Sequence, residues 1–494
     1  MKKQHFGQIL TIVLLASLCL GSCKCKKKKH SAPAPAPAVH VPVPAPVFVP
    51  PPVVVQPTPP VFSEGRQWVN HIVSVYPEIT WLANAAVRKT EEGQAAVDKP
   101  YSEQMFGQKF IEFDRSLMSL YCMKLILDGS DKSYQEFTAA QPENVKLSRE
   151  SFRTLHEQGI RLVNSNYQNI TPFEMLQAME TALVLGDLGK SEVAREIFKV
   201  YGAYAPDHDD FHGQAMAILR NNPRLSQSFS RLSYPAQQLL LKVANLAHYG
   251  HVTHLEGGPS MFSKLKQSNV PTTDASALSF DLFVHTCDVA GALGHVNNTS
   301  SIVYTEQTHR AMQAMAQACH VLTDPAKTEA DAYDAYISVR ASWIGLNPSD
   351  RDDRVLTRIA AMLRLFTPEE GTALKNAISQ LSSEDRQRIV SQLDVRLGEE
   401  VGRTPTYMPA VLVNLYNNKD LGATPSERLS QAVIRGLPFL AKVLQHHHEK
   451  LAQNQASLDI PLNFNKVAGV AKSKPDLLLK NEFQIESDGN VIIQ

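Results

Sequence analysis

Histidines are concentrated in the middle of this 494-residue chain, close to several aspartates. Nine of the seventeen histidines lie between His208 and His320, in less than a quarter of the sequence. Neutral imidazole rings and carboxylates are the side chains that hold divalent transition metals in proteins. This segment therefore predicts a metal site, and the spacing of its residues indicates which of them can share one ion.

The first candidate pair is expected at the start of a helix. His208 and His212 are four residues apart, so they lie on the same face of a helix and can reach one metal ion. Asp207, Asp209 and Asp210 surround His208. Acidic residues in a first turn also stabilise a helix by complementing its dipole. Metal ligation and helix capping are therefore both open interpretations of this segment.

A run of three histidines follows an apolar, leucine-rich helical segment. His248, His251 and His254 recur at every third residue, and Glu256 follows them. Glycines within and after the run predict an irregular loop, which can bring several of these side chains to one point. The alternative is a solvated loop whose histidines bind nothing.

Residues 281–295 carry the third group, in a segment that is otherwise apolar or small. On a helix, four ionisable side chains lie on one stripe: Asp281, His285, Asp288 and His295. A helix that is apolar on all sides is buried, and buried ionisable groups must be paired or bound to a metal. His285 and Asp288 therefore qualify as ligands. The alternative is an internal pair in which Asp288 orients His285.

Residues 205–295 resemble the HD-domain metal-dependent phosphohydrolases. In that family a first histidine on a helix is followed by a His-Asp pair and, later, by an aspartate in an apolar helix. His212 matches the first histidine, with His208 as a rival. His248 matches the histidine of the pair, and Asp288 matches the last aspartate. The resemblance implies one or two divalent metal ions and the hydrolysis of a phosphoester.

The chain departs from this family at one ligand. Tyr249 stands where the paired aspartate is expected, so His251 or Glu256 would have to take its place. A metal in such a site lowers the pKa of its bound water and polarises a phosphoryl oxygen. His251 or His254 would then donate a proton to the leaving group. The nearest basic residues for holding a phosphate are Lys264, Lys266 and Arg310.

We therefore predict a divalent metal ion, of unspecified identity, as the cofactor. The expected ligands are His212, His248, His285 and Asp288, with His208, His251 and Glu256 as alternates. The expected catalytic residues are His251 and His254. The competing hypothesis is a non-catalytic helical binding or scaffold lipoprotein with a structural or vestigial His/Asp cluster, and Tyr249 favours it.

The N-terminus is predicted to be a signal and a membrane anchor. Two lysines precede an apolar stretch at 9–20 that is too short to span a bilayer comfortably. The segment Leu20–Cys23 resembles the bacterial lipobox, which implies cleavage before Cys23 and acylation of that residue. Two or three acyl chains hold a protein stably on a membrane, and Lys24 favours the outer membrane. The alternative is an ordinary signal peptide.

A spacer is expected between this anchor and the body. Residues 31–63 are almost only Pro, Ala and Val. Proline fixes φ and removes a backbone donor, so thirty such residues predict a polyproline II tether reaching roughly 90 Å. Residues 1–29 hold seven lysines and no acidic residue, whereas the remaining chain has 42 basic and 49 acidic residues. A mildly acidic body predicts no nucleic-acid partner.

The body is predicted to be all-α. From residue 63 onward, apolar residues recur with helical spacing. Three helix starts share an N-cap Thr, a Pro at the next position and a Glu at the third, in 171–174, 367–370 and 424–427. Alternation with a period of two residues surrounds Asp488-Gly489, which predicts a C-terminal hairpin.

These patterns give a fold class and a division of the chain. We expect an all-α, large multi-helix array with a small C-terminal β-hairpin, preceded by a Pro-rich disordered tether. The expected parts are a signal peptide (1–22), a lipidated Lys-rich then Pro-rich tether (23–63), an N-terminal helical region (64–204), a His-rich helical core (205–325), a C-terminal helical region (326–456) and an extended tail with the hairpin (457–494). Cys287 and Cys319 are predicted to be buried free thiols, with a disulfide between them as the alternative.

Overall fold

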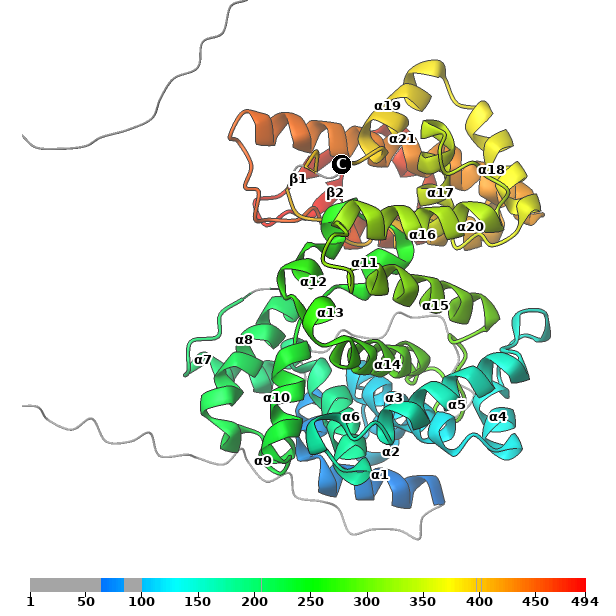
Figure 1. Cartoon of the computed structure of the whole chain (residues 1–494). Helices are drawn as coiled ribbons and strands as arrows, with labels where there is room; N and C mark the ends of the chain where they lie inside the picture. The colour runs from blue at the N-terminus through cyan, green and yellow to red at the C-terminus, as the bar shows by residue number, and fades with distance from the viewer. Residues whose placement is uncertain (1–63, 84–99, 206, 397, 401) are drawn as a thin grey trace, which may run out of the picture. The chain divides into compact units, whose positions relative to one another are not determined.

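The computed structural model describes residues 64–83, 100–205, 207–396, 398–400 and 402–494, all within a unit of residues 61–494 (Figure 1). The predicted signal peptide, the lipidation site Cys23 and the Pro-rich tether lie outside the described residues. Within the described ranges the fold is all-α apart from one two-stranded sheet, as predicted. No helix in this part of the chain is long and apolar enough to cross a membrane.

The first fifteen helices run from residue 64 to residue 321. They are α1 (Glu64–Val75), α2 (Tyr101–Phe106), α3 (Ile111–Asp128), α4 (Asp131–Thr138), α5 (Arg149–Val163), α6 (Pro172–Gly186), α7 (Glu192–Lys199), α8 (His208–Asn221), α9 (Gln227–Ser230), α10 (Tyr234–Val243), α11 (Tyr249–His254), α12 (Ser263–Gln267), α13 (Val270–Thr273), α14 (Ala275–Gly291) and α15 (Glu306–Val321). Short 3-10 turns connect several of them, among them η4 (Leu188–Lys190).

The remaining elements complete the body. They are α16 (Glu329–Trp343), α17 (Arg351–Met362), α18 (Pro368–Ser379), α19 (Ser383–Leu393), α20 (Met408–Asn417), α21 (Pro425–Ala452), α22 (Asn465–Ser473), β1 (Phe483–Ile485) and β2 (Val491–Ile493). Strands β1 and β2 pair antiparallel, with Phe483 opposite Ile493. Gly489 in their connection has φ of +85°, a conformation that glycine adopts without strain. The predicted hairpin is therefore confirmed.

The buried apolar side chains form two hydrophobic cores. The first core extends from Val69 to Ile337 and includes Ala361. The second core extends from Ala341 to Val491. Trp343 packs against both of them. The division of the helical body at residues 205 and 326 stays a prediction.

Helix α14 is buried in the first core and packs closely against α3 (Figure 1). A Cβ atom at Gly291 would lie 2.2 Å from the backbone nitrogen of Ser119, and one at Gly294 would lie 2.3 Å from the carbonyl oxygen of Asp114. Only glycine permits this approach, because any side chain would collide with the backbone of α3. The contact fixes the position of the stripe that carries His285 and Asp288.

The helix starts follow the predicted capping chemistry. In each of the three Thr-Pro-x-Glu segments the Thr side chain accepts the backbone N–H of the Glu, and the Glu side chain accepts the backbone N–H of the Thr. Each capping interaction stabilises its helix by about 1 kcal/mol. These local interactions explain why the starts of α6, α18 and α21 are readable from sequence.

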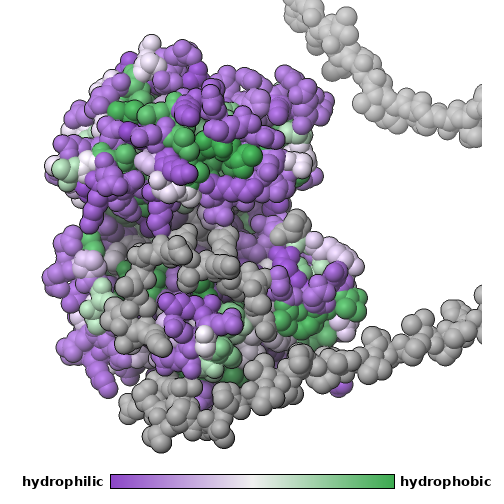
Figure 2. Space-filling view, turned by 180° about the vertical axis from the view of Figure 1, so that it is seen from behind, coloured by the Kyte–Doolittle hydropathy of each residue, from purple (hydrophilic) through white to green (hydrophobic). Residues whose placement is uncertain are grey.

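The three cysteines in the described ranges are free and buried: Cys122, Cys287 and Cys319. The alternative of a disulfide between Cys287 and Cys319 is therefore wrong, and the thiol of Cys319 instead contacts the sulfur of Met315 at 3.7 Å. Hydrophilic residues cover most of the face shown in Figure 2, with smaller hydrophobic areas between them.

Candidate metal centre in a polar cavity

A cavity of about 330 Å³ lies within the first core. Helices α3, α6, α8, α10, α11 and α14 and the turn η4 contribute to its walls. Its ionisable side chains are Arg115, Asp187, Lys190, His208, Asp209, His212, His248, Tyr249, Asp281, His285 and Asp288. All four predicted ligands, His212, His248, His285 and Asp288, thus line one cavity, together with the alternate His208.

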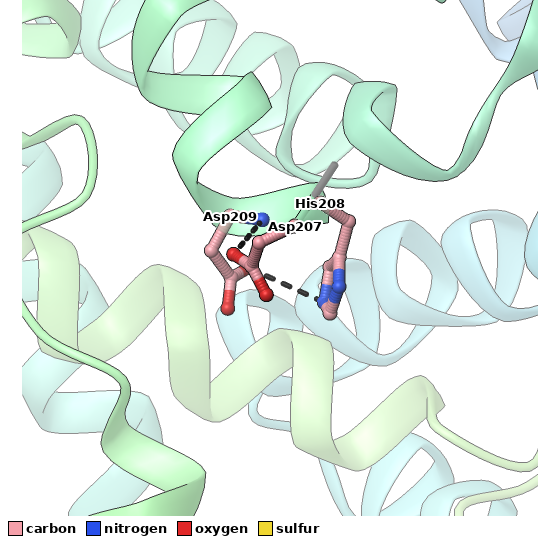
Figure 3. A group of neighbouring side chains, drawn as sticks. All are labelled: Asp207, His208 and Asp209. Carbon is pink, nitrogen blue, oxygen red and sulfur yellow. Dashed lines mark hydrogen bonds and ion pairs between the residues drawn. The ribbon is translucent and has the colours of Figure 1, made fainter. Parts of the chain in front are cut away.

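The first turn of α8 brings three possible ligands together. Asp207 is the N-cap, and its Oδ1 accepts the backbone N–H groups of Asp209 at 3.1 Å and Asp210 at 3.0 Å. The Nε2 atom of His208 lies 3.4 Å from Oδ1 of Asp209. The ligand atoms of Asp207, His208 and Asp209 lie within 4.8 Å of one another (Figure 3), and no other such group of three occurs among the described residues.

This turn is held in place from outside the cavity. The carboxylate of Asp210 pairs with Lys264 at 3.0 Å and with Arg403 at 2.9 Å. Capping by Asp207 and these two ion pairs restrain the backbone that carries His208 and Asp209. Metal ligation and capping, the two interpretations of the sequence, are therefore compatible, because Asp207 performs the capping and Asp209 faces the cavity.

His248 completes the arrangement around Asp209. It is the N-cap residue of α11, and its Nε2 atom lies 2.9 Å from Oδ2 of Asp209. Burial alone would raise the pKa of Asp209, but the hydrogen bond from His248 and the charge of His208 lower it below its ordinary value. Burial likewise opposes the charged form of His248, but the bond to Asp209 raises the pKa of His248 overall. One carboxylate therefore lies between two imidazole rings.

Two further imidazole nitrogens lack a hydrogen-bond partner. They are Nε2 of His285 and Nδ1 of His212, both almost inaccessible to solvent. Burial, followed by the charge of His248, lowers the pKa of His285 to about 4. Burial also lowers the pKa of His212, whose ring hydrogen-bonds the carbonyl group of Leu185. Both rings are thus neutral at pH 7, the form in which histidine binds metals.

The opposite end of the cavity is an ion-pair network. Lys190 lies 2.7 Å from Asp187 and 3.2 Å from Glu112, and Arg115 lies 3.2 Å from Glu112. The Nε of Arg115 has no acceptor. Burial, and then the charge of Asp187, raise the pKa of Asp288. Among the described residues no hydrogen bond to the Asp288 carboxyl group is found, but the positive charges of Arg115 and Lys190 act on it and oppose the rise of its pKa.

The two ends differ in their access to solvent. The side chains of His208 and His248 are 39% and 45% exposed, whereas those of Lys190 and Asp187 are 23% and 16% exposed. The histidine end is therefore the mouth of the cavity, and the ion-pair network lies deeper.

Tyr249 occupies the position at which the HD-domain pattern has an aspartate. Its hydroxyl donates a hydrogen bond of 2.7 Å to Asp281, and its ring centroid lies 5.1 Å from that of His285. Burial raises the pKa of Asp281 to about 7 and keeps the Tyr249 phenol protonated by raising its pKa further. Asp281, on α14, is thus a carboxyl group of the cavity that Tyr249 holds by a hydrogen bond.

Three predicted residues lie outside the cavity lining: His251, His254 and Glu256. The ring of His251 stacks on that of His248 at 3.6 Å, and its Nε2 lies 3.4 Å from Glu256. Burial lowers the pKa of His251 to about 2, so the ring is neutral. Burial raises the pKa of Glu256 to about 7, although its carboxyl group accepts backbone N–H groups at the start of α20. Their roles as ligands or catalysts stay predictions.

The basic residues expected to hold a phosphate lie outside the cavity lining. Lys264 binds Asp210, Lys266 binds the carbonyl groups of Pro325 and Lys327, and Arg310 lies over the ring of Trp343. Arg115 and Lys190 occupy the cavity instead. Neither residue was among the site residues predicted from the sequence, and nor were Asp187 and Asp209. Asp209 could have been found from the sequence because it lies next to His208. Arg115 could not, because it lies in a helix almost a hundred residues upstream.

The comparisons place the chain in a family. A model of a family of unknown function (DUF6829) matches residues 72–474. The chain belongs to this family. No curated protein and no solved structure matches it.

Proposed function

We propose that this member of DUF6829 is a lipid-anchored exported protein whose cavity binds a divalent metal ion and hydrolyses a small phosphoester. One observation carries the proposal. Asp209 lies between the rings of His208 and His248 in a cavity that also contains an unpartnered nitrogen of His285.

Asp209 lies at ligand-like distances from each of the two rings. The ligand atoms of His208, Asp209 and His248 do not all lie within 4.8 Å of one another, so one ring has to turn for the three to share an ion. Ligands at about 2.0–2.2 Å from a metal, separated by tetrahedral or octahedral angles, lie about 3.0–3.5 Å from one another. The distances from Asp209 to His248 and to His208 are 2.9 Å and 3.4 Å. We assign Asp209, His248 and His208 as the central ligands, with His285 or His212 completing the set. The mixture of imidazole and carboxylate suits zinc, iron or manganese.

The deeper end of the cavity supplies what a phosphoester requires. A bound metal provides a nucleophilic water near neutral pH. The guanidinium of Arg115 and the ammonium of Lys190 provide positive charge for phosphoryl oxygens. The raised pKa of Asp288 lets its carboxyl group carry a proton toward a leaving alkoxide.

Tyr249 favours a second candidate, a binding protein without turnover. Its hydrogen bond to Asp281 removes one carboxylate from the reach of a metal. With fewer carboxylates the cavity can still hold an ion and a ligand, and the helical body would then act as a receptor or scaffold on the membrane.

The metal site is tested on the full chain purified in detergent. Wild-type protein is expected to retain about one divalent ion after dialysis, measured by elemental analysis, and to hydrolyse a phosphomonoester such as p-nitrophenyl phosphate. Asp209→Asn is expected to lose both properties. Asp352→Asn, which removes an exposed carboxylate in the first turn of α17, is the matched control. Metal without turnover supports the binding protein, and absence of metal from the wild type contradicts both.

The anchor is tested separately. Labelled palmitate is expected to enter the wild-type protein in cells and to be absent from Cys23→Ala, which should move from the membrane fraction to the soluble fraction. An unlabelled wild-type protein would contradict the lipobox.

A further inference from the structure

A second group of cationic side chains gathers near Trp343, and none of its members lines the cavity. The guanidinium of Arg310 on α15 lies 4.5 Å from the Trp343 ring centroid. That of Arg340 on α16 lies 5.1 Å from the same ring and 4.7 Å from Phe366. The two rings stack at 5.9 Å with an interplanar angle of 24°. We call this set, with Arg364 beside it, the arginine stack.

Arg364 belongs to the same neighbourhood. It follows α17 with φ of +60°, and Arg340 donates a hydrogen bond of 3.1 Å to the carbonyl group of the next residue, Leu365. The charges of both arginines act on His254, whose Nδ1 has no partner. Arg310 on α15, Arg340 on α16 and Arg364 just after α17 thus place three positive charges in this neighbourhood.

The arginine stack has no counter-ion. No carboxylate in the described part of the chain lies within ion-pair distance of Arg310, Arg340 or Arg364, although Arg340 is only 2% exposed. Glu370 follows Arg364 closely in the sequence, and its carboxylate accepts the backbone N–H groups of Phe366 and Thr367. Contacts with aromatic rings offset part of the repulsion between like charges, but they leave the net charge in place.

Arg358, a buried arginine on the next helix, differs from Arg340 because it has acidic neighbours. Arg358 is 3% exposed and donates hydrogen bonds to the carbonyl groups of Leu255, Glu256 and Leu393. The negative charges of Glu256, Glu400 and Asp394 act on it. Two buried arginines on consecutive helices therefore differ: Arg358 has acidic neighbours, and Arg340 has further arginines.

We propose that the arginine stack is a binding site for a phosphate-type oxyanion. Arg310 and Arg364 are exposed and can reach a ligand, and the planar guanidinium fork matches the oxygens of a phosphate group. Arg340, which is buried, adds a third positive charge to the site. The ligand is a phosphomonoester or the phosphodiester of a lipid headgroup, both of which present the same oxygens. This site is independent of the function proposed for the cavity.

The test is equilibrium binding of two probes to the full chain in detergent, with a chelator present to keep the cavity free of metal. Inorganic phosphate represents a free monoester, and glycerophosphoglycerol represents a lipid headgroup. The double variant Arg310→Gln/Arg364→Gln is compared with Arg386→Gln/Arg396→Gln, which removes two exposed arginines at and after α19. Circular dichroism verifies that both variants fold.

We expect the wild type and the control variant to bind one of the probes. The stack variant should bind it at least about tenfold more weakly, because each charge-assisted hydrogen bond contributes that much. Preference for phosphate identifies a free monoester, and preference for glycerophosphoglycerol identifies a headgroup. No binding of either probe by the wild type, or equal losses in the two double variants, would overturn the proposal.

Discussion

Two aspartates in one cavity have opposite pKa shifts, although burial raises the pKa of both. Asp209 at the mouth and Asp288 at the deeper end are the same chemical group in the same hydrophobic core, yet the pKa of Asp209 is lowered and that of Asp288 is raised. Asp209 accepts a hydrogen bond from His248, whereas Asp288 accepts none and lies near the negative charge of Asp187. Burial raises the pKa of both carboxyl groups, and at Asp209 the hydrogen bond from His248 and the charge of His208 reverse the shift.

This difference assigns the two residues different chemistry. A carboxylate that stays ionised is suited to holding a cation, and one that resists ionisation is suited to carrying a proton. The predicted ligand set contained Asp288 and omitted Asp209. We propose that these two roles are exchanged, and the predictions below test this assignment.

The first prediction compares the two aspartates directly. Asp209→Asn should weaken metal binding by at least about 100-fold, because it removes the carboxylate at the centre of the ligand group. Asp288→Asn should weaken binding by less than about tenfold while lowering phosphoester hydrolysis. Competition with a metal-sensitive dye measures both affinities. Equal losses of affinity in the two variants would place both residues among the ligands.

The second prediction concerns the unpartnered ring of His285. His285→Gln should weaken metal binding by about tenfold or more, since the loss of one ligand from a mixed site has this effect. His71→Gln, at an exposed position on α1, is the control. If His285→Gln binds metal like the wild type, then His212 completes the site instead.

The third prediction uses the pH dependence of stability in metal-free protein. The pKa of Asp288 is raised on folding, so its contribution becomes unfavourable as pH rises from about 4 through the raised pKa. Asp288→Asn should therefore increase the free energy of unfolding at pH 7.5 by on the order of 1 kcal/mol. Asp209 has a lowered pKa, so it stabilises above about pH 4, and that stabilisation is lost as pH falls.

Denaturant unfolding of the two asparagine variants at pH 4, 6 and 7.5 measures these contributions. We expect the change in the free energy of unfolding to have opposite signs in the two variants at pH 7.5, with Asp209→Asn less stable than the wild type. Destabilisation of equal size in both variants would show that the two carboxylates have equivalent environments.

The smallest expected effect comes from Tyr249→Phe. This change removes the hydrogen bond to Asp281 and nothing else, so it should reduce stability by about 1 kcal/mol. Metal affinity should stay equal or rise, because the Asp281 carboxyl group is released toward the cavity. A strong loss of metal would instead make Tyr249 part of the site.

The sequence predicts the helices and strands of this protein better than it predicts which of them contact one another. The Thr-Pro-x-Glu starts depend on residues three apart, and the strands of the hairpin at Gly489 pair residues at most ten apart, so each can be predicted from one short segment. The apolar stripe of α14 predicts a buried helix and locates His285 in a core. Arg115 and Lys190 could not be predicted in this way. Their local sequence does not distinguish them, and they line the cavity only because α3 and η4 pack beside it.

The same limit explains why Asp209 is not among the ligands predicted from the sequence. A carboxylate in a first helical turn is typical of a cap, and only the position of His248, contributed by another helix, distinguishes Asp209 from Asp207. The spacing groups His254 with His251, but His254 lies outside the cavity lining, where the charges of Arg364 and Arg340 act on it.

The central claim is that one metal ion lies between Asp209 and His248. Anomalous diffraction from crystals of the protein grown with Zn²⁺ or Mn²⁺ tests this claim most directly. We predict a peak about 2.0–2.2 Å from a carboxylate oxygen of Asp209 and from Nε2 of His248, with His208 or His285 in the same shell. A cavity without a peak at metal concentrations that saturate the protein would contradict the account.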